Sequence, residues 1–382
     1  MGVPTYPQIG CPSVARWVSR PACAPSAARS TIHNMDSLTQ AVLGATVYGA
    51  VMGRKQGRRA LIYGAMLGTL PDLDVVFSYP DPVSAMTHHR GFSHSLIVLT
   101  AFSFLLAWLS TKFKPSPHYS GKRLCLAIWL TLVTHPVLDA FTTYGTQLLW
   151  PFMPTPTAWS TIFIVDPAYT VPLALATLLG LVLGIRAWTW RALCGALALS
   201  TAYLAFTVGA KLIVHQEAKK ALTSQGVAYT TLFSGTAPLN SLLWRVMAKD
   251  DTGHYYEGFI SLLDTGTPTF TRLPLHPELT AALADSPEHQ RLRWFTGDWL
   301  RYDQVGDALV VTDLRMGMAG HHFFRFHMAT RSDQGWQPIV PTNWAGDRGG
   351  SRELSVLWHR VWNETPPLPL EQWDSKMQAA ER

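Results

Sequence analysis

The sequence contains little cysteine, and none of it is arranged as a disulfide or metal motif. Cys11 and Cys23 lie in the N-terminal tail, while Cys125 and Cys194 lie in apolar runs. No two cysteines form a CxxC pair, and the second half of the chain contains none. A disulfide framework and a thiolate zinc site are therefore excluded there. Any metal must be held by nitrogen and oxygen atoms.

Charge is also scarce. Charged residues make up 15% of the sequence and hydrophobic residues 48%, a low share of charge for a protein that is soluble throughout. The long apolar runs end near Gln216, and charge is concentrated from Glu217 onward. The net charge of +6 does not indicate intrinsic nucleic-acid binding, because no stripe of Lys and Arg alternates with aromatic residues.

The chain is expected to divide into three parts. Residues 1–34 contain no acidic residue and no clean apolar core of a signal peptide. They are interpreted as a mis-annotated start before Met35 or, alternatively, as a transit-like or disordered leader. A transmembrane domain is predicted at 35–216, and an extramembrane domain at 217–382.

Six apolar segments precede the charged half: 38–52, 60–77, 93–110, 123–142, 167–185 and 192–213. The last four approach the roughly 20 residues that a spanning helix needs. The first two are shorter and rich in glycine, and small residues would let their backbones pack closely; the glycines concerned are Gly44, Gly49, Gly64 and Gly68.

The loops between these segments predict an orientation. Three of them are basic and contain Arg54, Lys55, Arg58 and Arg59; Lys112, Lys114, Lys122 and Arg123; and Arg186 and Arg191. The positive-inside rule places such loops in the cytoplasm. The loop at 78–92 and the charge-free stretch 141–165 would then face outward. The predicted location is a bacterial inner membrane, crossed several times, with the C-terminal domain on the periplasmic side.

After Gln216 the pattern changes to short strands separated by turns. Strands are predicted at 228–233, 253–262, 309–314 and 322–328, and helices at 239–248 and 277–284. The expected fold is therefore mostly α: a transmembrane bundle of about five to six segments, followed by a smaller soluble α+β domain.

One His–Asp pair lies inside an apolar helix. His135 and Asp139 are four residues apart, so both side chains lie on one face and can reach one ion. Ionisable groups in such segments are costly and tend to pair, bind metal or react. A buried His–Asp hydrogen bond between helices is the alternative interpretation.

Further candidate ligands lie at the same, outward ends of their segments. Asp72 and Asp74 flank one residue and would repel each other without a cation or proton between them, although either could cap a helix. His89 and His94 bracket a turn that opens the next helix. The predicted metal ligands are Asp72, Asp74, His89, His94, His135 and Asp139.

A sulfur-free ligand set suits Zn²⁺, with Mn²⁺ or Fe²⁺ as alternatives. Such an ion lowers the pKa of bound water and polarises a phosphoryl or carbonyl oxygen. Asp74 or Asp139 is the candidate general base. Arg90 is predicted to neutralise charge on a phosphate-like transition state or, alternatively, to bind a lipid headgroup.

These motifs together resemble a known family: bacterial inner-membrane-associated proteins regarded as metal-dependent hydrolases, one branch of which is labelled LexA-binding. The resemblance covers roughly residues 35–170 and implies a helical core and hydrolysis. Ser93 stands where many members have Thr. Gln40 stands where some branches have His, so fewer metal ligands are expected here. The motifs are Met35-Asp36-Ser37-Leu38-Thr39-Gln40, Pro71-Asp72-Leu73-Asp74, His89-Arg90-Gly91-Phe92-Ser93-His94-Ser95, Thr134-His135-Pro136-Val137-Leu138-Asp139 and Tyr144-Gly145-Thr146-Gln147.

Three functions compete at this stage. The favoured hypothesis is a membrane hydrolase acting on a phosphoester or ester, with membrane lipids or a lipid-linked substrate as its partners. The alternative is a non-catalytic membrane protein with a structural or sensory metal site. Metal transport predicts ligands near the bilayer midplane, and their predicted position at one end of the bundle disfavours it.

Overall fold

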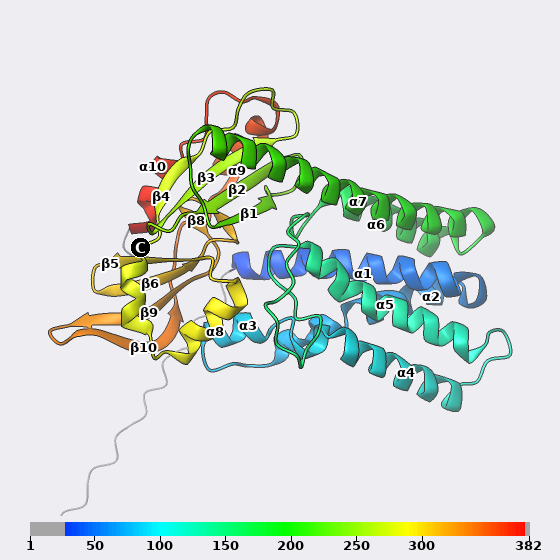
Figure 1. Cartoon of the computed structure of the whole chain (residues 1–382). Coiled ribbons are helices and arrows are strands. Elements are labelled where there is room, and N and C mark those ends of the chain that lie inside the picture. The colour runs from blue at the N-terminus through cyan, green and yellow to red at the C-terminus, as the bar shows by residue number, and fades with distance from the viewer. Residues whose placement is uncertain (1–26, 379–382) are drawn as a thin grey trace, which may run out of the picture.

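The computed structural model describes the backbone of residues 27–378 and the side chains of residues 37–378. The expectation for residues 1–26 of the leader lies outside this range. The backbone of residues 27–34 forms the first turns of α1 (Ala27–Gln56). Helices dominate the first half of the chain, and antiparallel sheets dominate the second (Figure 1).

The N-terminal helices lie side by side along one direction (Figure 1). Three are long and apolar enough to cross a membrane: α4 (Leu96–Phe113), α5 (Gly121–Phe141) and α7 (Ala187–Ser224). A fourth, α6 (Pro167–Leu183), is apolar but shorter. The expectation of about five to six membrane segments is thus confirmed only in its coarser form, a helical region with three candidate spans and one shorter apolar helix.

The first two helices pack at very short range, as their glycines predict. A Cβ atom on Gly64 of α2 (Arg58–Thr69) would lie 2.4 Å from the carbonyl oxygen of Gly44 in α1. A Cβ atom on Gly68 would lie 2.5 Å from the carbonyl oxygen of Gln40. Only glycine permits this approach, which brings the end of α2 against the part of α1 that contains Gln40.

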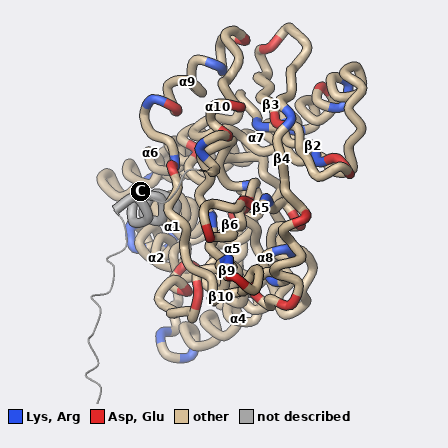
Figure 2. The backbone as a smooth tube through the Cα atoms, turned by 90° about the vertical axis from the view of Figure 1, so that its left-hand side faces the viewer, with Lys and Arg blue, Asp and Glu red and all other residues tan. Residues whose placement is uncertain are grey.

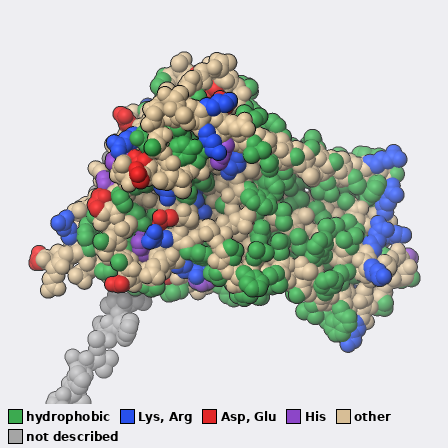
Figure 3. Space-filling model, viewed as in Figure 1, with side chains coloured by type: hydrophobic (Ala, Val, Ile, Leu, Met, Phe, Trp, Pro, Cys, Tyr) green, Lys and Arg blue, Asp and Glu red, His purple; other side chains and the backbone are tan. Residues whose placement is uncertain are grey.

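The surface of the bundle matches a membrane environment. Figure 3 shows hydrophobic side chains over the helices and Lys and Arg at the end remote from the C-terminal domain. That end consists of the turns between α1 and α2, α4 and α5, and α6 and α7. The three basic loops therefore lie together, opposite the C-terminal domain.

Short elements join the helices at the other end of the bundle. They are the 3₁₀ turn η1 (Pro71–Val76), the helix α3 (Pro82–His88) and the 3₁₀ turn η2 (Phe92–His94). Proline begins η1 and α3, where its missing N–H costs nothing. The Ser95 hydroxyl accepts the backbone N–H of Val98 at 3.4 Å and so caps α4 directly after η2.

Two four-stranded antiparallel sheets form the core of the C-terminal domain. Figure 2 shows acidic and basic residues interspersed over this domain. The first sheet has the order β1 (Thr231–Thr236), β2 (Leu243–Lys249), β3 (His254–Ser261), β4 (Thr271–Pro274). The second has the order β10 (Gly335–Asn343), β9 (Arg325–Ser332), β6 (Ala308–Asp313), β5 (Leu300–Val305). A small hairpin and five helical elements complete it: β7 (Gly317–Met318), β8 (His321–His322), η3 (Pro277–Leu283), α8 (Pro287–Thr296), α9 (Ser351–Trp362), α10 (Leu370–Asp374) and η4 (Ser375–Gln378).

The predicted helix at 239–248 is wrong, because Leu243–Lys249 forms the strand β2. The first six residues of β2 are all buried, so the polar–apolar alternation of a half-exposed strand is missing. The helix expected at 277–284 is the 3₁₀ element η3. The strands predicted at 253–262 and 309–314 are confirmed by β3 and β6, whereas the strand predicted at 322–328 is divided between β8 and β9.

Helix α7 joins the two halves without a break, so the predicted boundary at Gln216 falls inside it. Its outer part packs on the first sheet, where Ala210, Val214 and Ala218 share a core with Trp244 and Val246. A second contact lies beside α3, where Val83 and Tyr144 pack in one core with Phe295 of α8. The C-terminal domain therefore rests on the end of the bundle that contains η1, α3 and η2.

Candidate metal centre

Four predicted ligands converge at the end of the bundle. Asp72 comes from η1, His94 from η2, and His135 and Asp139 from one face of α5. One ligand atom of each lies within 4.8 Å of the others. Helices α1 and α2 both pack against α5, so residues far apart in the sequence meet at the end of α5 that contains His135 and Asp139.

The spacing of these atoms fits a small cation. The Nε2 atoms of His94 and His135 are 3.1 Å apart, and each lies 3.3 Å from Asp72 Oδ1. Asp139 Oδ2 lies 3.1 Å from His94 Nε2 and 3.4 Å from His135 Nε2. A tetrahedral ion with bonds of roughly 2.0–2.2 Å separates its ligand atoms by roughly 3.3–3.6 Å. The observed separations are close to that range.

Hydrogen bonds aim both imidazole lone pairs at the centre. His135 Nδ1 donates to the carbonyl oxygen of Gly68 at 2.6 Å, because a carbonyl can only accept. Ser93 Oγ donates to Asp74 Oδ2 at 2.7 Å, so it accepts from His94 Nδ1 at 2.9 Å. In a neutral imidazole the other nitrogen, Nε2, then has its lone pair available for a ligand.

The two carboxylate oxygens of Asp139 differ in their hydrogen bonding: Oδ1 has a donor and Oδ2 has none among residues 37–378. Gln40 Nε2 donates to Asp139 Oδ1 at 2.9 Å, and the Arg90 guanidinium lies 3.3 Å from the same oxygen. Among residues 37–378, Asp139 Oδ2 is buried without a hydrogen-bond partner. A buried unpaired carboxylate oxygen that faces two imidazole lone pairs is costly unless a cation lies between them. The residues present therefore fit a metal ion.

The other two predicted ligands, Asp74 and His89, lie beside this group and pair with each other. His89 Nδ1 is 2.9 Å from Asp74 Oδ1. Asp74 Oδ2 also accepts the backbone N–H of Arg90 at 3.2 Å and the hydroxyl of Ser93. Asp74 is thus connected to His94 through Ser93 and is placed to orient it.

Arg90 is buried at the edge of the centre. Its side chain is 3% exposed, donates to the Thr142 hydroxyl at 3.1 Å and lies over the Tyr144 ring, with 5.0 Å between Cζ and the ring centroid. Its backbone has φ of +60°, a left-handed conformation that costs energy in a residue with a side chain. The turn His89-Arg90-Gly91 thus holds the guanidinium between Asp139 and Tyr144.

The comparisons place this region in a family. The family described as YdjM inner membrane protein matches residues 35–214. Residues 35–214 belong to that family. "Uncharacterized protein YfhP" of Bacillus subtilis (strain 168) is 30% identical over 142 residues, which cover 35% of the present chain. The chain spans 42% of the length of that relative. No solved structure matches the chain.

All four converging ligands, Gln40 and Arg90 lie within the YdjM region. The sequence therefore predicted the family whose model matches residues 35–214. Its orientation in the membrane and the metal's identity stay predictions, as do the ligand roles of Asp74 and His89 and the catalytic roles of Asp74, Asp139 and Arg90.

Asp72 and Asp74 are both biased toward ionisation. Burial favours a neutral Asp72, but when the His135 ring is protonated, its charge and the hydrogen bonds from His135 and His94 outweigh burial and hold the pKa of Asp72 well below its usual value. Burial likewise opposes ionisation of Asp74, while His89 and Ser93 lower its pKa. Both carboxylates are therefore negative at neutral pH and complement a cation.

Three supporting residues were not predicted. Gln40 was noted only as a replaced ligand, yet it donates to Asp139. Gly68 was expected only to allow close helix packing, yet its carbonyl oxygen accepts from His135. Ser93 was noted only as a replacement for Thr, yet its hydroxyl accepts from His94. Only Ser93 is next to its partner, His94, in the sequence. Gln40 and Gly68 have partners more than 60 residues away, Asp139 and His135, so little in the sequence indicated these two contacts.

Proposed function

We propose that the protein is a membrane-bound, metal-dependent hydrolase acting on a phosphoester or ester, lipid-linked in the favoured case, at the periplasmic membrane surface. The observation that supports it is the convergence of two imidazole nitrogens and two carboxylate oxygens at one point. Zinc is the favoured ion, with manganese or iron as alternatives, because no sulfur atom belongs to the group. When bound, such an ion makes water a better nucleophile near neutral pH.

The residues of the chain have separate roles in this proposal. Asp72, His94, His135 and Asp139 hold the ion, and Gln40, Gly68 and Ser93 keep the ligand atoms aimed at it. Asp74 lies outside the four ligand atoms and is the carboxylate left to accept a proton from water. Arg90 neutralises negative charge that develops on the substrate.

A structural or sensory metal site is the second candidate, and burial favours it. The side chains of His94, His135 and Asp139 are at most 1% exposed. Asp72 is the ligand with access, since its side chain is 16% exposed. A catalytic ion needs a position open to water and substrate, whereas a structural ion does not.

One experiment separates the two. The detergent-solubilised protein is analysed for bound metal and assayed on a panel of phosphoesters and carboxyl esters, together with His135→Ala and Asp74→Asn. Hydrolysis is expected in the parent and lost in both variants, with metal lost in His135→Ala and retained in Asp74→Asn. A metal-loaded parent that turns over no ester would exclude catalysis and leave the structural role.

A further inference from the structure

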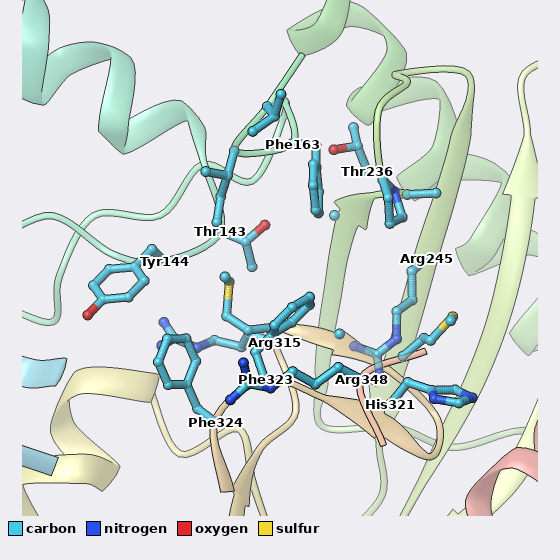
Figure 4. A pocket seen from close by; sticks show the side chains of 18 of the residues that line it. Thr143, Tyr144, Phe163, Thr236, Arg245, Arg315, His321, Phe323, Phe324 and Arg348 are labelled. Carbon is cyan, nitrogen blue, oxygen red and sulfur yellow. The ribbon is translucent and has the colours of Figure 1, made fainter. Parts of the chain in front are cut away.

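A cavity of about 220 Å³ lies between the helical bundle and the C-terminal domain. The bundle side contributes His89, Arg90 and the segments 143–144 and 163–165. The other side comes from the first sheet, the β7–β8 region and α9. Figure 4 shows its labelled side chains gathered around the open space from both halves of the chain.

Most of the wall is apolar. Phe163, Ile164 and Val165 line it from the loop before α6, and Phe233, Phe323 and Phe324 line it from the C-terminal domain. The loop before α6 also exposes Leu149 and Phe152 on the outside of the molecule. Large exposed side chains at the end of a membrane bundle suit the interface with lipid. The Phe163–Val165 part of the apolar wall therefore belongs to a loop at the membrane edge.

Cationic groups lie on the side of the cavity opposite Phe163, where Phe323 and Phe324 also lie (Figure 4). Figure 4 shows Arg245, Arg315 and Arg348 on one side of the space, across from Phe163. Within the described part of the chain, none of the residues lining the cavity is acidic. Two of these arginines pair with carboxylates that do not line the cavity: Glu257 binds Arg245 at 2.7 Å, and Asp313 binds Arg315 at 2.8 Å.

These pairs hold the Arg245 and Arg315 side chains in fixed positions before any ligand arrives. A guanidinium has five N–H donors, and its carboxylate partner uses only some of them. The cavity thus combines a preorganised cationic wall with an apolar wall. This combination fits a molecule that has an anionic group at one end and a hydrocarbon chain at the other.

The cavity adjoins the candidate metal centre through two residues. Arg90 lines the cavity and lies 3.3 Å from Asp139 Oδ1. His89 also lines it and is paired with Asp74. A ligand with its anionic end in the cavity would therefore lie one side chain away from the four ligand atoms.

We propose that this cavity binds an anionic amphiphile of lipid origin, with the anionic group on the arginine wall and the apolar chain along Phe163–Val165. The identification of that amphiphile as the substrate rests on the proposed function. Binding itself does not, because none of the four metal ligands lines the cavity.

The test measures binding of radiolabelled dodecyl phosphate to the full chain in phosphatidylcholine nanodiscs, with empty nanodiscs as the blank. Arg348→Gln removes the least buried of the cavity arginines and is expected to weaken binding about tenfold, the loss of one charge-assisted contact. Val165→Trp fills the apolar side and is expected to abolish binding. The matched control is Arg352→Gln, which removes a charge four residues after Arg348. Arg352 does not line the cavity, so this variant should bind dodecyl phosphate as the parent does.

Two competitors separate the parts of the ligand. Unlabelled dodecanol and inorganic phosphate are each expected to compete at least tenfold more weakly than unlabelled dodecyl phosphate, because each lacks one end. If dodecanol competes as well as unlabelled dodecyl phosphate, the apolar chain alone accounts for binding. If inorganic phosphate competes as well, the cavity is a site for free phosphate. Either result, or parent-like binding by both cavity variants, overturns the proposal.

Asp72→Asn distinguishes failure of the cavity proposal from failure of the hydrolase proposal. The variant is expected to bind dodecyl phosphate as the parent does. If the parent holds no metal and cleaves no ester, yet binding depends on Arg348, the hydrolase is excluded and the cavity stands. If the parent is an active metalloenzyme and the cavity variants bind normally, the cavity assignment alone is excluded.

Discussion

At the scale of single residues, Asp139 depends on Gln40. The amide donates to Oδ1 and leaves Oδ2 facing the two imidazoles. We predict that Gln40→Ala lowers metal affinity roughly 10- to 100-fold, the usual effect of losing a group that orients a ligand. Metal retained after dialysis against graded chelator concentrations measures this. Gln216→Ala, at an exposed position of α7, is the control, and equal retention by both variants would contradict the role of Gln40.

His322 predicts a pH dependence of stability. It is 2% exposed, and within residues 37–378 neither ring nitrogen has a hydrogen-bond partner. Burial, together with Arg245 and Arg325, holds the pKa of His322 well below its usual value of 6.5. The folded chain therefore keeps the ring neutral, while the unfolded chain binds a proton below pH 6.5. The contribution of His322 is fully present above pH 6.5 and is lost as pH falls, by up to about 1.4 kcal/mol per pH unit.

Thermal unfolding between pH 8 and pH 5 checks this prediction. The melting temperature of the parent is expected to fall more steeply below pH 6.5 than that of His322→Leu. The matched control is His359→Leu, at an exposed position of α9, which should keep the slope of the parent. Identical slopes for the parent and His322→Leu would show that His322 is protonated in the folded protein.

The sequence was informative about individual ligands because their chemistry is local. Acids and imidazoles inside apolar segments stand out, and all four converging residues were among the six predicted. The division between the four and the pair Asp74–His89 was not predictable. It depends on how η1 and η2 turn against α5, and side chains only two residues apart, such as Asp72 and Asp74, point to different partners.

At the scale of elements, the contact between α1 and α2 positions the metal centre. Gly64→Ala would place a methyl group 2.4 Å from the Gly44 carbonyl oxygen, with backbone rather than a flexible side chain in the way. We predict a loss of about 1–3 kcal/mol in stability, typical of overpacking, and weaker metal binding because Gly68 O moves away from His135. Melting temperature and metal content of the solubilised protein measure the two effects.

Gly195→Ala is the control for this substitution. A Cβ at Gly195, in α7, meets no atom within 4 Å, and alanine favours a helix by roughly 1 kcal/mol over glycine. It is therefore expected to be neutral or stabilising. Equal melting temperatures for the two alanine variants would show that the close approach of α1 and α2 does not contribute to the stability of the protein.

Elements were predictable where periodicity or length was decisive. The long apolar helices α4, α5 and α7 were found from their composition, and β3 and β6 from short β-rich runs between turns. Strand β2 was mistaken for a helix, since Leu243–Lys249 lies between β1 and β3 with both faces covered. A segment buried on both faces has no period that separates strand from helix.

At the scale of the whole molecule, the basic loops lie at the end of the bundle remote from the C-terminal domain (Figure 3), whereas η1 and η2, which carry ligands of the candidate metal centre, lie at the other end. We predict that the loop between α4 and α5 faces the cytoplasm and the β9–β10 turn faces the periplasm. In a background with all four native cysteines replaced by serine, a membrane-impermeant thiol reagent should label Asp333→Cys in intact spheroplasts. It should label His118→Cys only after lysis, and the reverse pattern would invert the topology.

The arrangement of the two halves could not be predicted from the sequence. Composition separated an apolar half from a charged half, but it says nothing about which surfaces meet. The core shared by Val83, Tyr144 and Phe295 joins bundle residues to one that lies about 150 to 210 positions later, and the cavity beside it joins residues as far apart as His89 and Leu357. Only the folded chain shows that the C-terminal domain covers the end of the bundle that contains the candidate metal centre.

The unbroken helix α7 has a mechanical consequence. Its 38 residues measure about 57 Å at 1.5 Å per residue, while the hydrocarbon layer is only about 30 Å thick. A helix of this length has room for a spanning part and an outer part of similar length. The Lys211 ammonium joins it to the loop before α6 by donating to Trp159 O and to β1 by donating to Ser234 O. In a thinner bilayer such a rod leans further. Because Lys211 ties the helix to β1, a tilt of α7 is expected to change the orientation of the first sheet relative to the membrane plane.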